Sequence, residues 1–271
     1  MRRAREFRGD PAPTRPAATV VLLRPEGEAF QVYVLKRAAT MVFGGLHAFP
    51  GGGVDPTDQP ETIRTDWAEH LGVSGERARA IVGAAARELF EEAGVLLAGP
   101  VDEIDRTVSD GTLTGVVTHG HEVEGNGVVG DVSAEDWEAD RAAVAARKLT
   151  LTDLLTRRGL RLRDDLLLPW ARWITPEFEP KRFDTWFFVA LLPEGQTARD
   201  VSGESESATW VSPAAANGLA MLPPTRSTVN SLLPYRKIAE VIAAGSRRNA
   251  ATPVLPRVEL RADGSALLHV D

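Results

Sequence analysis

Residues 87–95, with the sequence RELFEEAGV, constrain this chain more than any other segment. They place one arginine and three glutamates within six residues, inside an apolar run that predicts a helix. Residues three and four apart share a helix face, so Glu88, Glu91 and Glu92 are expected to project together. Arg87 can reach Glu91 on the same face. Three like charges repel each other, and a divalent cation would relieve that repulsion; the alternative is a solvated helix face with salt bridges.

The composition is that of an ordinary globular protein. A chain of 271 residues, 43% hydrophobic and 25% charged, can bury a substantial core as one elaborated domain or two small ones. The net charge of −7 disfavours a nucleic-acid partner, which usually requires a basic stripe. The absence of cysteine excludes disulfides, thiolate catalysis and zinc–thiolate sites. No apolar run reaches the length of a membrane span, so we expect a cytoplasmic protein without a membrane partner.

Alternating strand and helix patterns predict an α/β fold with a mixed sheet covered on both faces. Strands are expected at residues 19–23, 31–35, 47–50, 170–174 and 182–192, with a final hairpin at 254–270. Helices are expected at residues 61–71, 78–93, 134–147, 151–158, 212–219, 225–233 and 235–244. We expect a disordered tail over residues 1–16, rich in arginine and proline, and a single elaborated domain over residues 17–271, with helical elaboration at about 100–165.

The helix segment matches the second half of the Nudix box, Arg-Glu-apolar-any-Glu-Glu-any-Gly-apolar, at every fixed position. Residues 49–55, FPGGGVD, resemble the Phe-Pro-Gly-Gly start of its first half. Asp58 stands where that half usually has a glutamate. The chain therefore resembles the Nudix hydrolase superfamily, which implies an α/β/α sandwich with a mixed sheet and, here, helical insertions.

The two halves of the box are unusually far apart in this chain. Residues 59–86 separate Asp58 from Arg87, where the usual gap is short, so residues 59–79 are interpreted as an insertion. This insertion resembles the branch of peroxisomal coenzyme A diphosphatases. The segments RFDT at 182–185 and LPPT at 222–225 are also similar to that branch, and Gly45 matches its signature. Met41 departs from that signature, which has an arginine at this position.

The expected metal site consists of oxygen ligands, which select Mg²⁺ or Mn²⁺ over softer metals. The resemblance implies that Glu91 and Glu92 are metal ligands, with the carbonyl of Gly51 completing the shell. It implies that Glu88 is either a ligand or the base that activates water. Arg87 would orient the carboxylates through charge-assisted hydrogen bonds.

Further residues are expected on the substrate side of the site. Gly52 and Gly53 would let the backbone approach a diphosphate closely. A distant loop often supplies another acid in this superfamily; Glu204 is the first candidate and Glu206 the second, with a polar hairpin as the alternative interpretation. Arg37 and Arg182 are candidate phosphate ligands. For Arg182, the alternative is a structural ion pair with Asp184.

These residues predict a metal-dependent diphosphatase acting on a nucleoside diphosphate linked to another group, with coenzyme A or acyl-coenzyme A as the leading substrate. ADP-ribose, NADH and dinucleotides are alternative substrates. Another alternative is a domain that senses a nucleotide without turnover, although such a sensor need not retain Arg87 and the three glutamates. The expected partner is a small nucleotide substrate, and a homodimer is an option because relatives are often dimers.

Overall fold

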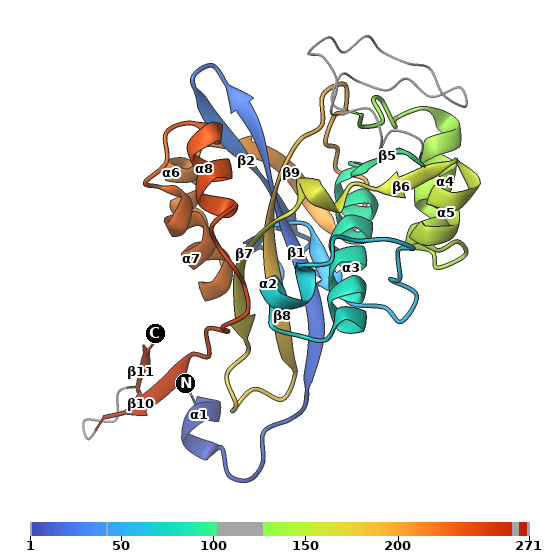
Figure 1. Ribbon diagram of the computed structural model, residues 1–271. Helices are drawn as coiled ribbons and strands as arrows, with labels where there is room; N and C mark the ends of the chain where they lie inside the picture. The colour runs from blue at the N-terminus through green and yellow to red at the C-terminus, as the bar shows by residue number, and fades with distance from the viewer. Residues whose placement is uncertain (1, 42, 102–126, 262–265, 270–271) are drawn as a thin grey trace.

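The computed structural model describes residues 2–41, 43–101, 127–261 and 266–269. Its centre is a seven-stranded mixed sheet (Figure 1). The strands are β1 (Thr14–Glu26), β2 (Ala29–Arg37), β3 (His47–Ala48), β4 (Gly51–Gly53), β7 (Leu168–Ile174), β8 (Arg182–Leu191) and β9 (Ser205–Val211).

Strand β1 organises this sheet. It runs parallel to β8 from Thr14, opposite Arg182, to Leu23, opposite Leu191. Its first half pairs antiparallel with β4, and its second half pairs antiparallel with β2. Strand β2 then pairs with β3 and β9, while β7 closes the other side of the sheet by pairing with β8. The short glycine strand β4 is therefore held against the middle of the sheet.

Helices cover both faces of the sheet, as Figure 1 shows. One side carries α2 (Trp67–Leu71), α3 (Gly75–Ala93), α4 (Glu135–Ala145) and α5 (Leu151–Arg157), with the small β5–β6 ladder (Ala98–Pro100, Leu160–Leu162) and the 3₁₀ turn η2 (Asp164–Leu166). The other side carries α6 (Pro213–Asn217), α7 (Pro223–Leu232) and α8 (Ile238–Gly245). Outside the sandwich lie α1 (Arg2–Glu6) and the hairpin of β10 (Arg257–Leu260) and β11 (Ala266–His269).

The sheet separates two hydrophobic clusters. Val20 and Leu22 of β1 belong to the cluster under α3, whereas Val21 and Leu23 belong to the cluster under α6–α8. Successive side chains of a strand point to opposite faces, so the continuous apolar run of β1 is what a strand buried on both faces requires. The expected α/β sandwich with a mixed sheet is confirmed.

Helix α3 is fixed at both ends. The hydroxyl of Ser74 accepts a hydrogen bond from the backbone N–H of Arg77 at 3.3 Å, which places the start of the helix three residues before the expected residue 78. Gly94 ends it in the left-handed conformation, with φ of 63°, as its sequence position predicts. The box residues therefore occupy the last two turns of a helix that packs on the sheet.

Some expected elements differ in the structure. The N-terminal tail was expected to be disordered, but residues 2–6 form α1 and β1 already begins at Thr14, because its first residues pair with β8. Of the helix expected at residues 61–71, only α2 forms; the helix expected at 235–244 begins only at Ile238. The turn of the final hairpin and residues 102–126 of the stretch at 100–165 lie outside the described residues. None of the helices in the described part of the chain has the length and apolar character needed to cross a membrane.

Candidate active site

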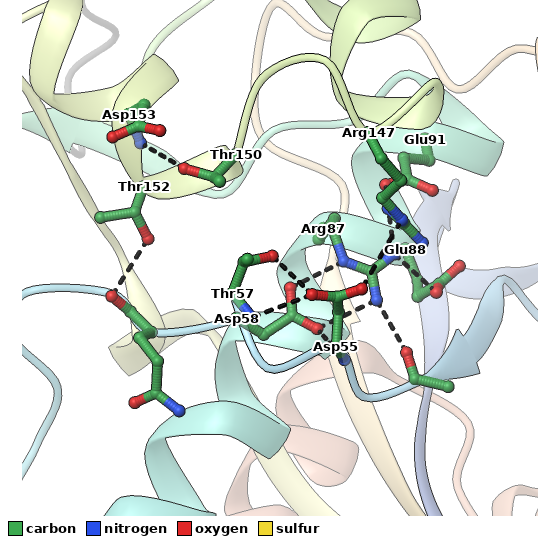
Figure 2. Close-up of polar contacts among 12 residues, drawn as sticks. Asp55, Thr57, Asp58, Arg87, Glu88, Glu91, Arg147, Thr150, Thr152 and Asp153 are labelled. Atoms are coloured by element: carbon green, nitrogen blue, oxygen red, sulfur yellow. Dashed lines mark hydrogen bonds and ion pairs between the residues drawn. The ribbon is translucent and has the colours of Figure 1, made fainter.

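Arg87 lies at the centre of the site and is 2% exposed. Its guanidinium donates to both carboxylate oxygens of Asp58, from Nε at 2.7 Å and from Nη2 at 3.0 Å. Nη1 donates to Glu88 Oε1 at 2.7 Å and to Glu91 Oε1 at 3.1 Å (Figure 2). Nη2 also donates to the carbonyl of Gly53 at 2.8 Å. One side chain thus joins both halves of the box and the glycine strand.

Asp58 approaches Arg87 although residues 59–86 separate them in the chain. Asp58 is 4% exposed and also accepts a hydrogen bond from the backbone N–H of Asp55 at 2.7 Å. Gly83 of α3 makes this approach possible, because a Cβ atom there would lie 2.8 Å from Cδ of Pro60 and 3.0 Å from the backbone of Asp58. No local sequence pattern indicates this role of Gly83.

Glu88 lies against the glycine strand. A Cβ atom on Gly52 would stand 2.5 Å from Glu88 Oε1, so only glycine leaves room for this carboxylate. The pKa of Glu88 is raised to about 7, chiefly by burial; Arg87 opposes the rise, and the charge of Glu91 adds to it. Glu88 is therefore a buried acid with a pKa close to neutrality.

Glu92 lies next to Glu88, on the side towards β2. Its Oε2 accepts a hydrogen bond from the backbone N–H of Gly51 at 2.9 Å. Burial raises the pKa of Glu92 to about 8, and the charges of Glu88 and Glu204 add to the rise. Two neighbouring carboxyls therefore have pKa values raised chiefly by burial, although Arg87 and Arg37 lie close to them.

A small pocket borders Glu92 and contains two further residues expected at the site. It is lined by Leu35, Arg37, Ala48, Phe49, Glu92, Ser202, Glu204 and Ser205. The carbonyl of Glu204 accepts a hydrogen bond from the N–H of Ala38 at 2.9 Å, which holds the loop before β9 against the end of β2. The structure thus brings Arg37, Glu92 and Glu204 together.

Glu206, the second candidate acid, lies elsewhere. Its carboxylate pairs with Lys36 at 2.8 Å and accepts the backbone N–H of Ala39 at 3.1 Å on an exposed surface. These contacts favour Glu204 over Glu206 as the acid nearest the glutamate cluster.

Arg182 is not part of this arrangement. It pairs with Thr14 on β1, whereas Gly51 pairs with Thr19, about 16 Å further along the strand. Its guanidinium donates to the carbonyls of Thr175 at 3.0 Å and Ala12 at 2.8 Å, so it fastens the N-terminal segment to the sheet. The contacts do not favour its expected role as a phosphate ligand.

The alternative interpretation of Arg182, an ion pair with Asp184, is wrong. Asp184 pairs instead with Arg172, whose Nε and Nη2 both donate at 2.8 Å, and with Arg77 at 3.2 Å. Residues 182 and 184 do lie on the same face of β8, because side chains two apart on a strand point the same way. The ion-pair partner of Asp184 nevertheless comes from the neighbouring strand β7, which supplies Arg172.

Glu91 has a second cationic neighbour, Arg147, that the sequence did not indicate. Arg147 follows α4 and donates from Nη1 to Glu91 Oε1 (Figure 2). It lies 56 positions from Glu91 in the chain, so no local pattern connects the two residues.

The donor set fits a hard divalent cation. The carboxylates of Glu88, Glu91 and Glu92 and the carbonyl of Gly51 are all oxygen donors, which are the ligands that hard divalent cations prefer. Among the described residues, no three histidine, cysteine, aspartate or glutamate side chains already converge to hold a metal ion. Arg87 and Arg147 both form ion pairs with the carboxylate of Glu91.

Comparisons with known proteins identify the domain family and the fold. Residues 13–171 match the NUDIX domain family. A NUDIX hydrolase from Alicyclobacillus acidocaldarius has a similar fold, with a TM-score of 0.65 at 23% identity, covering 89% of this chain and 99% of that one.

More distant similarities include two structures with bound or named nucleotides. The Caenorhabditis elegans Ap4A hydrolase gives a TM-score of 0.42 at 13% identity, covering 85% of this chain and 99% of that one. The NUDIX domain of Shewanella oneidensis NrtR, complexed with ADP ribose, gives a TM-score of 0.39 at 12% identity, covering 84% of this chain and 92% of that one. Among curated proteins, no match was found. Because the domain match spans more than half of the sequence, the chain belongs to the Nudix hydrolase family.

Proposed function

We propose that this protein is a divalent-metal-dependent diphosphatase, which hydrolyses the diphosphate bond of a nucleoside diphosphate linked to a second group. The observation that carries the proposal is the packing of the buried Glu88 carboxylate against Gly52, with Glu92 bound to the N–H of Gly51. This packing joins an acidic cluster to a glycine strand whose backbone a diphosphate can approach. Members of the Nudix family typically use divalent metals.

Glu88, Glu91, Glu92 and the carbonyl of Gly51 are the groups that would hold Mg²⁺ or Mn²⁺. When bound, the metal would neutralise the diphosphate and polarise its phosphoryl oxygens. Arg87 keeps Glu88 and Glu91 in place through its two Nη1 hydrogen bonds. Its contact with the carbonyl of Gly53 fixes the glycine strand relative to the acids.

Glu88 is suited to take a proton from the attacking water. A general base must lie within reach of the water that it activates, and the Glu88 carboxylate lies against the glycine strand that a diphosphate can approach. Glu204, across the pocket from Glu92, is the candidate for the additional acid.

Coenzyme A or an acyl-coenzyme A is the substrate we favour. The long segment between Asp58 and Arg87 and the similarity at residues 182–185 and 222–225 support that branch. Arg37 lines the pocket beside Glu92, where it supplies positive charge for a phosphate of the adenosine part. Hydrolysis would then release a phosphopantetheine and adenosine 3′,5′-bisphosphate.

The test is to incubate the purified protein with Mg²⁺ or Mn²⁺ and coenzyme A, acyl-coenzyme A, ADP-ribose, NADH and dinucleoside polyphosphates, and to identify the products by mass. Preferential cleavage of coenzyme A into two phosphomonoesters would support the whole proposal. Preferential cleavage of another substrate would support diphosphate hydrolysis and contradict coenzyme A as the substrate. Binding of these nucleotides without cleavage, unaffected by metal, would favour a nucleotide sensor instead.

A further inference from the structure

Arg147 places a second guanidinium on the carboxylate of Glu91. Its Nη1 donates to Glu91 Oε1, the same oxygen that accepts from Arg87, and its Nε lies 4.0 Å from Asp55 Oδ2 (Figure 2). The Arg147 side chain is 46% exposed, whereas that of Glu91 is 11% exposed. Arg147 therefore approaches the acid from the solvent side, and Arg87 approaches it from the interior.

The backbone of Arg147 is in a conformation that disfavours arginine. Its φ is 57°, in the left-handed region, directly after the last residues of α4. The N–H of Arg147 donates to the carbonyl of Val144, and that of Lys148 donates to the carbonyl of Ala143. Glycine or asparagine is preferred where a helix ends in this way. An unfavourable backbone conformation that sends a side chain into a catalytic cluster indicates a function for that side chain.

A divalent cation and Arg147 would use the same oxygen atoms of Glu91. A cation bound through Glu91 would also lie close to the guanidinium, and like charges at such distances repel strongly in a partly buried site. Both effects make Arg147 a competitor of the metal. Arg87 differs, because it is buried and held by Asp58 and Gly53 as well.

We propose that Arg147 is the counter-ion of Glu91 in the metal-free protein and that a divalent cation displaces it on binding. Arg147 then sets the metal concentration at which the site fills. It is a positioning residue, acting through Glu91, and this inference rests on the proposed metal-dependent function.

Calorimetric titration of Mn²⁺ into the metal-free protein tests this directly. Arg147→Asn removes the guanidinium while keeping a residue that tolerates the left-handed conformation. It should bind Mn²⁺ roughly tenfold more tightly than the wild type, because a nearby positive charge is gone. Arg147→Lys, which keeps the charge, should stay closer to the wild type than Arg147→Asn.

Lys148→Gln is the matched control, because it removes the same charge from the next residue, whose side chain is exposed. Its Mn²⁺ affinity should equal that of the wild type. In a Glu91→Gln background, Arg147→Asn should have no further effect, since its partner is missing. Thermal unfolding of each variant establishes that it is folded. If Arg147→Asn does not fold, Arg147→Gly replaces it in the titration.

The outcomes separate this inference from the proposed function. If the wild type binds Mn²⁺ and hydrolyses a diphosphate, but Arg147→Asn binds Mn²⁺ equally or more weakly, the role of Arg147 is overturned and the function stands. An equal increase in Mn²⁺ affinity in Lys148→Gln would also overturn it, because the effect would then come from the net charge and not from the contact with Glu91. If neither the wild type nor Arg147→Asn binds Mn²⁺, both proposals fail.

Discussion

Arg87 determines how the acids of the site are arranged. Its five N–H groups are directed at two oxygens of Asp58, one each of Glu88 and Glu91, and the carbonyl of Gly53. A lysine could not reproduce this planar fork. Arg87 holds Glu88 and Glu91 from the interior. The carboxylate of Glu92 instead accepts a hydrogen bond from Gly51 of the glycine strand and lines the pocket.

Glu92→Gln should abolish most turnover without unfolding the protein. The amide oxygen of glutamine can still accept the hydrogen bond from Gly51, so the fold should be preserved. Loss of a charged ligand should reduce kcat roughly hundred- to thousandfold, since a metal contributes several kcal/mol to stabilising the transition state. Steady-state kinetics with the best substrate of the panel, together with thermal unfolding, would measure both effects.

Glu206→Gln is the control for this variant, because Glu206 is exposed and paired with Lys36 away from the cluster. It should retain wild-type kcat. Near wild-type activity in Glu92→Gln would contradict the proposed mechanism, as would an equal loss in the control.

The stability of the metal-free protein should fall as the pH rises. The pKa values of Glu88 and Glu92 are raised to about 7 and about 8 by burial, from an ordinary 4.5. The folded protein therefore binds more protons than the unfolded chain above about pH 4.5, and this stabilisation is lost as the pH passes through 7 to 8. Over the whole range from about pH 4.5 to about pH 8, the loss is roughly 3 kcal/mol for Glu88 and roughly 5 kcal/mol for Glu92.

Urea unfolding in the presence of a chelator, between about pH 5.5 and about pH 8.5, would measure this dependence. The double variant Glu88→Gln/Glu92→Gln should lose less stability over that range than the wild type. If the two proteins lost the same amount, the raised pKa values would not explain the effect. Added Mg²⁺ should reduce the loss in the wild type only.

Local spacing predicted part of this site, and tertiary packing supplied the rest. The contact between Arg87 and Glu91 follows from four-residue spacing on a helix, and the structure contains it. The position of Asp58 was anticipated only by comparison with a family pattern. Arg147 was not anticipated, because its approach depends on how α4 packs beside α3, and no periodicity records that.

At the level of elements, helix α3 carries the box residues, and the caps at its two ends determine where the helix begins and ends on the sheet. Its C-terminal glycine was predicted, because a left-handed residue commonly ends a helix. Its start lies three residues before the expected one, because the hydroxyl of Ser74 caps the helix there. The strand order could not be predicted, since the parallel pairing of β1 with β8 joins segments far apart in the chain.

Gly94→Ala should destabilise the protein by about 1 kcal/mol, because alanine disfavours the left-handed conformation at φ of 63°. A Cβ atom there would also lie 2.8 Å from Nη2 of Arg199, the end of a flexible side chain that can shift. The expected decrease in Tm is about 2–4 °C for a chain of this size.

Gly75→Ala is the matched control at the other end of α3. A Cβ atom at Gly75 meets nothing within 4 Å, and its φ lies outside the left-handed range. This change should leave Tm equal or slightly higher, because alanine favours helix. A decrease at Gly75 as large as that at Gly94 would contradict the role assigned to the helix end.

At the scale of the whole molecule, the site exists only where several distant segments meet. It combines the end of β2, the strand β4, the end of α3, Arg147 just beyond α4 and the loop before β9. The α/β/α architecture was predicted from alternation and family resemblance, and the structure confirms it. What could not be predicted is the set of buried contacts that holds these segments in position.

Gln196 is one such contact. It is 6% exposed; its Oε1 accepts the N–H of Leu96 at 2.9 Å, and its Nε2 donates to the carbonyls of Leu96 and Val129, both at 2.8 Å. It thus joins the segment after α3, the segment before α4 and the connection between β8 and β9.

Gln196→Ala should lower the free energy of unfolding by about 3 kcal/mol, because it leaves three buried backbone groups without their partner. Urea denaturation would measure the loss. Gln31→Ala is the control, since Gln31 bonds only to Arg24 and Glu26 among the contacts described for its side chain and is partly exposed. It should cost less than about 1 kcal/mol. A loss at Gln196 no greater than that at Gln31 would mean that packing of the hydrophobic clusters alone holds the three segments together.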